Sequence, residues 1–299
     1  MDLSVAIVNW NTREMLRECL DSLIQHLIGL DYEVIVVDNG STDGSVEMVV
    51  ECYPNVRVIQ NNENQGFARA NNQAIRDSTG RYILLLNSDA FIQDDSIEKM
   101  VAILDANPQI GIAGARLVYP DGSFQVSHSP LPNLNAERLS LLGMDRLLRK
   151  RQPINSDTGF IETGTVEGAC LIARREALDQ FGLMDEDFFF FSEEVDLCYR
   201  AHKYGWIVVS IPGTRVVHVA GGSTGIVPRR ILLLYRGKLQ YFEKHFGREA
   251  REKLYRAMVL STHIKVLAYS AVRIASLGHV RKDSLWKEVS KGLSEFRGQ

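Results

Sequence analysis

The stretch VIVVDNGSTDGS, residues Val34 to Ser45, decides the fold that we expect. Its first four residues are apolar and mostly β-branched, and the polar turn that follows contains two glycines. This order predicts a buried strand, a turn and then a helix. In open α/β sheets, ligands bind outside the carboxyl ends of the strands, so Asp38 lies where a base or a ribose could be bound. A plain turn capped by Ser41 or Asp43 would give the same pattern.

The same alternation of short apolar runs and helical patterns continues on both sides of this stretch. Apolar residues at intervals of three and four follow Asn11, and another helix begins near Asp95. The alternation predicts an α/β fold with a mostly parallel sheet flanked by helices. We expect its strands near residues 3–9, 33–38, 56–60, 81–86 and 111–118.

A second set of elements follows residues 119–165, which are rich in Pro, Asn, Ser and Gly and are interpreted as a loop-bearing insertion. We expect this set to return to the same core. It consists of a strand at 166–173, a helix at 193–204 and strands near 206–210 and 214–219.

Size and composition restrict the class of protein. A chain of 299 residues with 45% hydrophobic residues can hold one large domain, or one domain with an appendage. The four cysteines form no CxxC pair, which argues against a cysteine-based metal site and fits a reducing compartment. No signal-peptide pattern is present at the N-terminus, so we expect a cytoplasmic protein.

The net charge of −3 conceals a strong asymmetry. Residues 228–299 carry 16 Lys and Arg against 6 Asp and Glu, whereas residues 1–227 carry 18 against 31. This tail has a helical pattern throughout, and its apolar segment from Val259 to Leu277 contains charged residues, which suits a helix in a membrane interface better than one that spans it. A membrane surface, nucleic acid or simply a solvated helical face would each fit the charge.

Two further polar segments follow predicted strands. The amide-rich run Asn61–Asn72 surrounds Gly66, and helix entry after this glycine would offer free backbone N–H groups to a nucleotide or a diphosphate. The strand that begins at Ile83 ends with Asn87 and Asp89, whose oxygens could hold Mg²⁺ or Mn²⁺. Asx turns or a helix cap would explain the same residues. The chain contains neither GxGxxG nor GxxxxGK[ST], which argues against dinucleotide and P-loop sites.

Residues 187–198, DFFFFSEEVDLC, place four aromatic rings before Glu193, Glu194 and Asp196. On a helix, Glu193 and Asp196 share a face, while Glu194 points about 100° away from Glu193. The two glutamates can therefore serve separate roles. A charged first turn, favoured by the helix dipole, would also account for the acids.

The order of these motifs resembles that of the family 2 glycosyltransferases, in particular the bacterial rhamnosyltransferase-like branch. The resemblance covers about residues 3–225 and rests on motifs that occur in the family's order: SVAIVNWN, VVDNGSTDGS, NQGFARANNQA, LLLNSDA, EGACLIARREAL, DEDFFFFSEEVDLCYRAHKYGW and VVHVAGGST. It implies a GT-A fold, a Rossmann-like mixed and mostly parallel sheet. The catalytic domain would span residues 1–227, and a basic amphipathic helical extension would span 228–299.

The resemblance also implies site residues. The donor nucleotide would lie against five polar residues and one glycine. Asp89 with His218 would form the metal site, with Mg²⁺ or Mn²⁺ as cofactor. Asn87 stands where the family's motif has its first acid. Gly168 would lie at the floor near acceptor and donor sugar, and Gly222 and Ser223 would close over the diphosphate. The nucleotide set consists of Asn9, Asp38, Asn64, Gly66, Asn71 and Asn87.

By the same resemblance, Glu194 would be the general base and Glu193 its orienting neighbour, with Asp196 on the acceptor or diphosphate side. Glu194 replaces the family's usual aspartate. The implied reaction transfers rhamnose or a similar hexose from a dTDP- or UDP-sugar, with inversion, to a surface or lipid-linked glycan. No nucleic-acid partner is expected, and the basic tail would contact the cytoplasmic face of the membrane. A nucleotidyltransferase and a catalytically silent sugar-nucleotide or glycan-binding protein stay open as alternatives.

Overall fold

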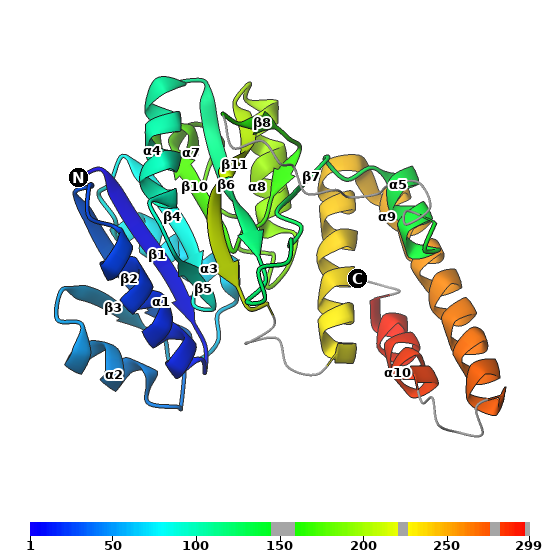
Figure 1. The fold of residues 1–299 in the computed structure, drawn as a ribbon. Helices are drawn as coiled ribbons and strands as arrows, with labels where there is room; N and C mark the ends of the chain where they lie inside the picture. Colours follow the sequence, from blue (N-terminus) through cyan, green and yellow to red (C-terminus); the bar gives the residue numbers. More distant parts are fainter. Residues whose placement is uncertain (145–158, 221–226, 276–281, 297–299) are drawn as a thin grey trace. The chain divides into compact units, whose positions relative to one another are not determined.

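The structure is a computed structural model that describes residues 1–144, 159–220, 227–275 and 282–296. Figure 1 shows its elements in chain order. The chain forms two compact units, and neither is continuous in sequence. The described residues of the first unit lie within Met1–Leu131, Gln152–Phe189 and Glu193–Ser223. Those of the second lie within Pro132–Arg151, Phe190–Ser192 and Thr224–Gln299.

The first unit is built on a mixed sheet, which has nine strands among the described residues. Its order is β3-β2-β1-β4-β10-β6-β11-β5, with β8 also paired to β11. The β3, β2, β1 and β4 strands are parallel, as are β6 and β11, whereas β10 is antiparallel to both β4 and β6. The strands are β1 (Leu3–Asn9), β2 (Tyr32–Asp38), β3 (Val56–Gln60), β4 (Tyr82–Asn87), β5 (Ala90–Ile92), β6 (Ile110–Val118), β8 (Ile161–Glu162), β10 (Cys170–Arg174) and β11 (Ile207–His218).

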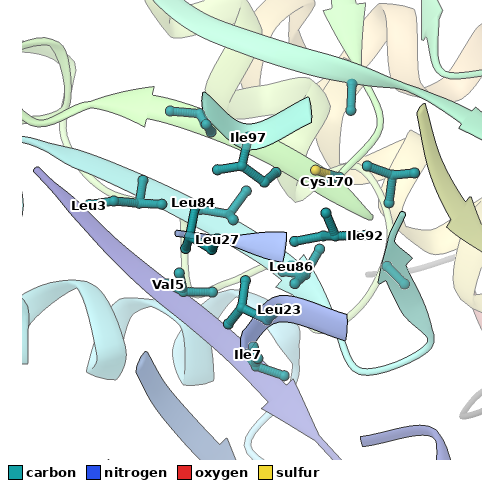
Figure 2. Packing of buried hydrophobic residues seen from close by; sticks show 14 of the residues in the cluster. Leu3, Val5, Ile7, Leu23, Leu27, Leu84, Leu86, Ile92, Ile97 and Cys170 are labelled. Carbon is teal, nitrogen blue, oxygen red and sulfur yellow. The ribbon is translucent and has the colours of Figure 1, made fainter. Parts of the chain in front are cut away.

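Helices cover both faces of this sheet because its central strands are apolar on both sides. In β1, Leu3, Val5 and Ile7 pack in one cluster, while Ala6 packs in the other. Figure 2 shows the first cluster, in which residues of β1 and β4 meet Leu23 of α1. This face is covered by α1 (Arg13–His26), α2 (Ser45–Cys52) and α4 (Ser96–Ala106), and the other by α3 (Phe67–Asp77), α7 (Arg175–Phe181) and α8 (Glu193–Lys203).

The strand register determines where the polar side chains meet. Asn9 pairs with Asp38 across β1 and β2, and Val8 pairs with Asn87 across β1 and β4. Parallel strands share one carboxyl edge, so the three polar residues that end these strands are brought to the same edge of the sheet.

The predicted α/β class and mostly parallel sheet are confirmed, and some boundaries differ. The two strands predicted near 206–210 and 214–219 form one strand, β11, with a register shift between Ile211 and Val216. The insertion predicted at 119–165 contains the short strand β7 (His128–Ser129) and the helix α5 (Leu134–Leu141), and β7 pairs with β9 (Thr165–Val166), which begins at the last residue of the insertion.

The second unit is helical. It consists of α5, the long helix α9 (Val227–Ala275), α10 (Lys282–Leu293) and a 3₁₀ turn, η1 (Ser294–Phe296), together with Phe190–Ser192. Gly247, at φ 83°, interrupts the helical backbone of α9. The unit that holds the predicted extension 228–299 therefore also takes in α5 and residues that precede α8. Within the described residues, no helix has the length and apolarity needed to cross a bilayer.

Candidate active site

Asn9 and Asp38, at the ends of β1 and β2, bind each other. The Asn9 amide Nδ2 donates to Asp38 Oδ2 at 2.9 Å and to Ser41 Oγ at 3.1 Å, and the Ser41 backbone N–H donates to Asp38 Oδ1 at 2.8 Å. Thr12 Oγ1 donates to Asn9 Oδ1 at 2.7 Å and contacts Ser88 Oγ at 2.9 Å. Both predicted nucleotide residues are thus held in one polar network at the end of their strands.

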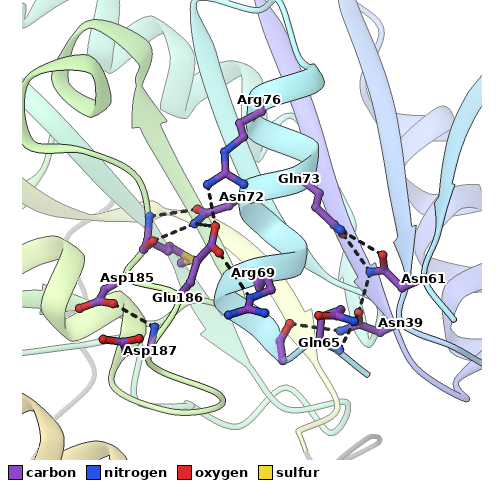
Figure 3. A network of polar contacts seen from close by, with 12 residues as sticks. Asn39, Asn61, Gln65, Arg69, Asn72, Gln73, Arg76, Asp185, Glu186 and Asp187 are labelled. Atoms are coloured by element: carbon purple, nitrogen blue, oxygen red, sulfur yellow. Dashed lines mark hydrogen bonds and ion pairs between the residues drawn. The ribbon is translucent and has the colours of Figure 1, made fainter. Parts of the chain in front are cut away.

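Asn39 is an organising residue of this edge that the sequence reasoning missed. Its side chain is buried, and Nδ2 donates to the Gly66 carbonyl at 3.2 Å, while Oδ1 accepts from Asn61 Nδ2 at 3.0 Å. Asn64 Oδ1 accepts from the Gly66 N–H at 2.9 Å. Figure 3 shows Asn39 and Asn61 in this network. The signal available in the sequence was its position next to Asp38, at the end of an apolar strand.

Gly66 brings the amide-rich loop against the aromatic segment. Its φ is 87°, and a Cβ at this position would lie 2.7 Å from the Phe189 carbonyl oxygen. The Phe67 N–H donates to that same oxygen at 2.9 Å. Only glycine combines this backbone conformation with so close an approach. The run of phenylalanines is therefore tied at Phe189 to the start of α3.

Asn71 and Asn72, which are adjacent in α3, make different hydrogen bonds. Asn71 is buried and donates to the Phe67 carbonyl of its own helix at 3.0 Å. Asn72 exchanges two hydrogen bonds with the backbone of Met184, at 2.8 and 3.1 Å, and donates to Glu186 at 3.0 Å. Figure 3 shows Asn72 and Glu186 together. The structure thus gives Asn71 a contact within its helix, while Asn72 links α3 to the segment that leads into the phenylalanines.

Asn87, Asp89 and His218 come together, as the motif order implied. Nε2 of His218 lies 3.2 Å from Asp89 Oδ1 and 3.4 Å from Asn87 Nδ2. Nδ1 of His218 lies 2.9 Å from Oε1 of Gln125, a residue that was not predicted. An amide oxygen only accepts hydrogen bonds, so the Gln125 contact engages Nδ1 as a donor and leaves Nε2 as the ring nitrogen that faces Asp89.

The donor atoms of this group fit a hard divalent cation. Asn87 Oδ1 is buried without a hydrogen-bond partner. Beside it, His218 Nε2 and Asp89 Oδ1 face each other. Oxygen and imidazole nitrogen are ligands of Mg²⁺ and Mn²⁺. Among the described residues, no three His, Cys, Asp or Glu side chains gather as a metal site. A cation here would thus need further oxygens, such as those of a diphosphate.

Glu193 and Glu194 open α8, and Gly168 lies beside them. A Cβ at Gly168 would be 3.7 Å from Glu194 Cβ and 3.7 Å from Phe67 Cε1. Glu193 is only 5% exposed, and its Oε2 has no hydrogen-bond partner. Burial is the main cause that raises the pKa of Glu193 to about 7, and the charge of Glu167 adds to it. Burial, and then the charges of Glu193 and Glu167, raise the pKa of Glu194 well above its usual range.

These carboxyls have the properties of an acid–base site. Burial and like charges raise the pKa of a carboxyl, which makes its ionised form a stronger base. Structural ion pairs perturb pKa values by pairing opposite charges. Here the perturbing charges have the same sign, and this argues for a functional role.

Asp196 does not share this environment, contrary to its predicted place on the acceptor or diphosphate side. It is fully buried and binds Arg200 Nε at 2.8 Å. Arg200 in turn donates to the carbonyls of Phe181, Gly182 and Leu183 at 2.5 to 3.0 Å. The pair therefore fixes the turn after α7, because a buried carboxylate needs a partner of opposite charge. Gly222 and Ser223 lie outside the described residues.

Comparison with known proteins identifies the family of the chain. Residues 4–182 match the sequence model of the family described as glycosyl transferase family 2. An N-acetylglucosaminyl-diphospho-decaprenol L-rhamnosyltransferase of Mycobacterium tuberculosis is 30% identical over 259 residues, which cover 78% of this chain and 83% of that protein. The low-salt glycan biosynthesis hexosyltransferase Agl10 of Haloferax volcanii is 27% identical over 212 residues, 68% of this chain and 62% of that protein.

A solved structure shares the fold. The mannosyltransferase PcManGT of Pyrobaculum calidifontis, in complex with GDP-Man and Mn²⁺, superimposes with a TM-score of 0.59 at 18% identity. The match covers 98% of this chain and 84% of that one. The predicted GT-A fold is thereby confirmed.

Proposed function

The chain belongs to glycosyl transferase family 2 and is a glycosyltransferase, and from that premise we propose that it transfers rhamnose or a similar hexose, with inversion, to a hydroxyl of a lipid-linked or surface glycan. The observation that carries the mechanism is the adjacent pair of a buried Glu193 and a half-buried Glu194, with Glu194 beside Gly168 and the pKa of both carboxyls raised.

In the proposed reaction, Glu194 removes the proton from the acceptor hydroxyl. The acceptor oxygen forms its bond to the anomeric carbon from one side as the bond from that carbon to the diphosphate oxygen breaks on the other, and a nucleoside diphosphate leaves. A carboxylate with a raised pKa is a stronger base than an ordinary one, and it takes the proton as the new bond forms. Glu193 limits the charge on its neighbour, because two adjacent buried carboxylates resist double ionisation.

For the donor, we propose a dTDP- or UDP-sugar whose nucleotide lies against Asn9, Asp38 and the loop of Asn64 and Gly66. Asp89 and His218, with Asn87 Oδ1, would hold Mg²⁺ or Mn²⁺ when it is bound, and such an ion offsets the charge of the departing diphosphate. The shared fold with a mannosyltransferase that binds GDP-Man and Mn²⁺ supports a donor of this class.

The proposed acceptor is lipid-linked, as the name of the mycobacterial relative suggests. We further propose peripheral contact with the membrane through α9. Its surface between Lys253 and Arg273 exposes Leu260 at 58%, Ile264 at 47% and Leu267 at 71%. These three side chains follow each other at intervals of four and three, so they form one apolar strip next to basic residues. An anionic bilayer would match both the apolar strip and the charge.

A screen of nucleotide sugars by thermal shift tests the donor proposal, because a ligand that binds only the native state raises its apparent stability. With Mn²⁺ present, we expect a dTDP- or UDP-sugar to raise the melting temperature of the wild-type chain. The shift should diminish in Asp89→Ala. Equal shifts in both proteins would remove Asp89 from the donor site, and no shift with any nucleotide sugar would contradict the donor class.

A further inference from the structure

Two consecutive residues before the glutamates have a strained backbone. Phe191 has φ 71° and Ser192 has φ 74°, and neither is a glycine. The left-handed region is unfavourable for residues with a Cβ, so such a turn persists only where its surroundings hold it. The next residue is Glu193, the first residue of α8. The geometry of this turn therefore sets the direction in which the two glutamates leave the chain.

The turn is held on one side by the contact of Phe189 with α3. The Phe189 carbonyl oxygen accepts a hydrogen bond from the Phe67 N–H at 2.9 Å. Gly66 also packs against this oxygen, so closely that a Cβ at Gly66 would lie 2.7 Å from it. Phe188, one residue earlier, is buried in the core. The chain is thus fixed immediately before the two left-handed residues.

On the other side the turn meets Gly237 of α9, which belongs to the same compact unit as Phe190–Ser192. A Cβ at Gly237 would lie 3.1 Å from the Phe191 carbonyl carbon and 3.1 Å from Ser192 Oγ, and closer still to the Phe191 carbonyl oxygen. Glycine in the interior of a helix lowers helix stability relative to alanine. Its presence at this position is explained by the backbone contact, which no other residue permits.

This part of α9 is itself anchored. Lys238, next to Gly237, binds Glu137 of α5 at 2.5 Å, and Tyr241 and Phe242, one turn further, are buried. A helix fixed by these contacts can oppose the relaxation of the turn.

We propose that Gly237 is a positioning residue for the transfer reaction: its backbone contact with Phe191 and Ser192 maintains the left-handed turn that orients Glu193 and Glu194. The proposal rests on the function proposed above. It gives Gly237 a role in addition to any contact of its helix with a membrane.

The test compares Gly237→Ala with Gly292→Ala in the full chain. At Gly292, the three atoms nearest to an added Cβ all belong to the flexible Leu232 side chain, so this control perturbs packing in the same unit at a place away from the turn. We expect Gly237→Ala to lower kcat at least tenfold with little change in the donor KM, and to shift the pH at which activity reaches half its maximum. Gly292→Ala should retain wild-type kcat and pH dependence.

Hydrogen exchange supplies a readout that does not depend on turnover. Amides of residues 191–197 should exchange faster in Gly237→Ala than in the wild type. In Gly292→Ala, these amides should exchange at the wild-type rate. Unchanged exchange there in Gly237→Ala, or an unchanged pH profile and kcat, would overturn the proposal. Failure of the proposed function can be distinguished from failure of the positioning role. If the proposed function is wrong, the wild-type chain releases no nucleoside diphosphate, while the hydrogen-exchange difference between Gly237→Ala and the wild type is still observed.

A second variant covers the case in which Gly237→Ala does not fold. Ser192→Gly relieves the backbone strain and should leave the melting temperature unchanged or higher, yet lower kcat because the turn is less rigid. A residue with a purely structural role would not lose activity while stability is kept. Wild-type kcat in Ser192→Gly would therefore count against the positioning role.

Discussion

At the scale of single residues, the carboxyls proposed for acid–base chemistry, Glu193 and Glu194, lower the stability of the folded protein. Glu193 is 5% exposed, and one of its carboxyl oxygens has no hydrogen-bond partner. Placing a charge there is unfavourable unless it is paired. The neighbouring charges have the same sign, so the protein tolerates the site at the expense of stability.

This cost predicts that Glu193→Gln stabilises the protein above neutral pH. The ordinary pKa of 4.5 rises to about 7 in the folded state, so the folded protein binds the proton more tightly and loses stability as pH rises from the lower value to the higher. The variant lacks this loss. We expect its free energy of unfolding at pH 8 to exceed that of the wild type by about 3 kcal/mol, since the pKa rises by about 2.5 units and one unit corresponds to about 1.4 kcal/mol.

Denaturant unfolding at pH 8 and at pH 4 measures the difference. The gain should vanish at pH 4, where both forms are protonated in the folded and unfolded chain. A variant that is less stable than the wild type at pH 8 would show that Glu193 has a stabilising partner.

Gln125 illustrates a positioning role that the motifs did not contain. Its contact with His218 Nδ1 leaves Nε2 facing Asp89. Loss of such a supporting hydrogen bond typically lowers metal affinity about 10–100-fold. Gln125→Leu should therefore weaken Mn²⁺ binding by that factor in calorimetry with a nucleoside diphosphate present, while Gln180→Leu, at an exposed position whose amide contacts Trp206, should not. Equal affinity in both variants would exclude the role of Gln125.

The limits of sequence reasoning at this scale are visible in particular residues. The order of the motifs predicted roles for Glu193, Glu194 and Asp89, and the structure places Asp89 beside His218 and both glutamates at the start of α8. Asp196 was misassigned because spacing on a helix gives its face but not its partner, and its partner Arg200 is one turn away. Asn39 and Gln125 act through tertiary contacts with residues 22 or more positions distant, which no local pattern reveals.

At the scale of elements, the parallel half of the sheet could be predicted because each strand carries its own signal of an apolar run and a polar end. The short strands could not: β5 and β8 have three and two residues and exist through their pairing with β11. The two strands predicted near 206–210 and 214–219 form one strand, because the register shift within β11 interrupts the apolar sequence pattern without interrupting the strand.

The junction of α3 with the aromatic segment makes an element-scale prediction for Gly66→Ala. The variant adds the strain of a φ of 87° and a clash with the Phe189 carbonyl. A matched control is Gly205→Ala, at φ 85° with no atom within 4 Å of the added Cβ. Strain alone costs about 1–2 kcal/mol, so Gly205→Ala should lose that much stability and Gly66→Ala distinctly more.

Thermal unfolding and donor affinity together check this prediction. Gly66→Ala should also weaken nucleotide binding, since the loop of Asn64 cannot keep its place, whereas Gly205→Ala should not. Similar losses in the two variants would mean that the close approach at Phe189 contributes little.

At the scale of the whole molecule, the charge asymmetry and the exposed strip on α9 predict membrane binding without a spanning helix. Replacing Leu260, Ile264 and Leu267 by Gln removes apolar surface that is already exposed to water, so folding should be retained. Binding to vesicles rich in anionic lipid should fall at least tenfold in sedimentation, because insertion of apolar side chains and attraction to anionic lipid act together.

Two controls make that result specific. Ile28→Gln, at a residue 82% exposed on the other unit, should not change vesicle binding. Raising the salt concentration should weaken binding of the wild type, because surface electrostatics are screened. Wild-type binding by the triple variant would exclude the strip as the lipid contact.

The central claim is that Glu194 serves as the base in transfer from a nucleotide sugar, and its most direct test is the product released by wild type and Glu194→Gln with an active donor and a lipid-linked acceptor. We predict acceptor-dependent release of a nucleoside diphosphate, a kcat lower by about 10²–10⁴ in the variant, and an unchanged donor dissociation constant. Wild-type activity should also fall as pH drops through the raised pKa of Glu194. Release of pyrophosphate from a nucleoside triphosphate, or wild-type kcat in Glu194→Gln, would contradict the account.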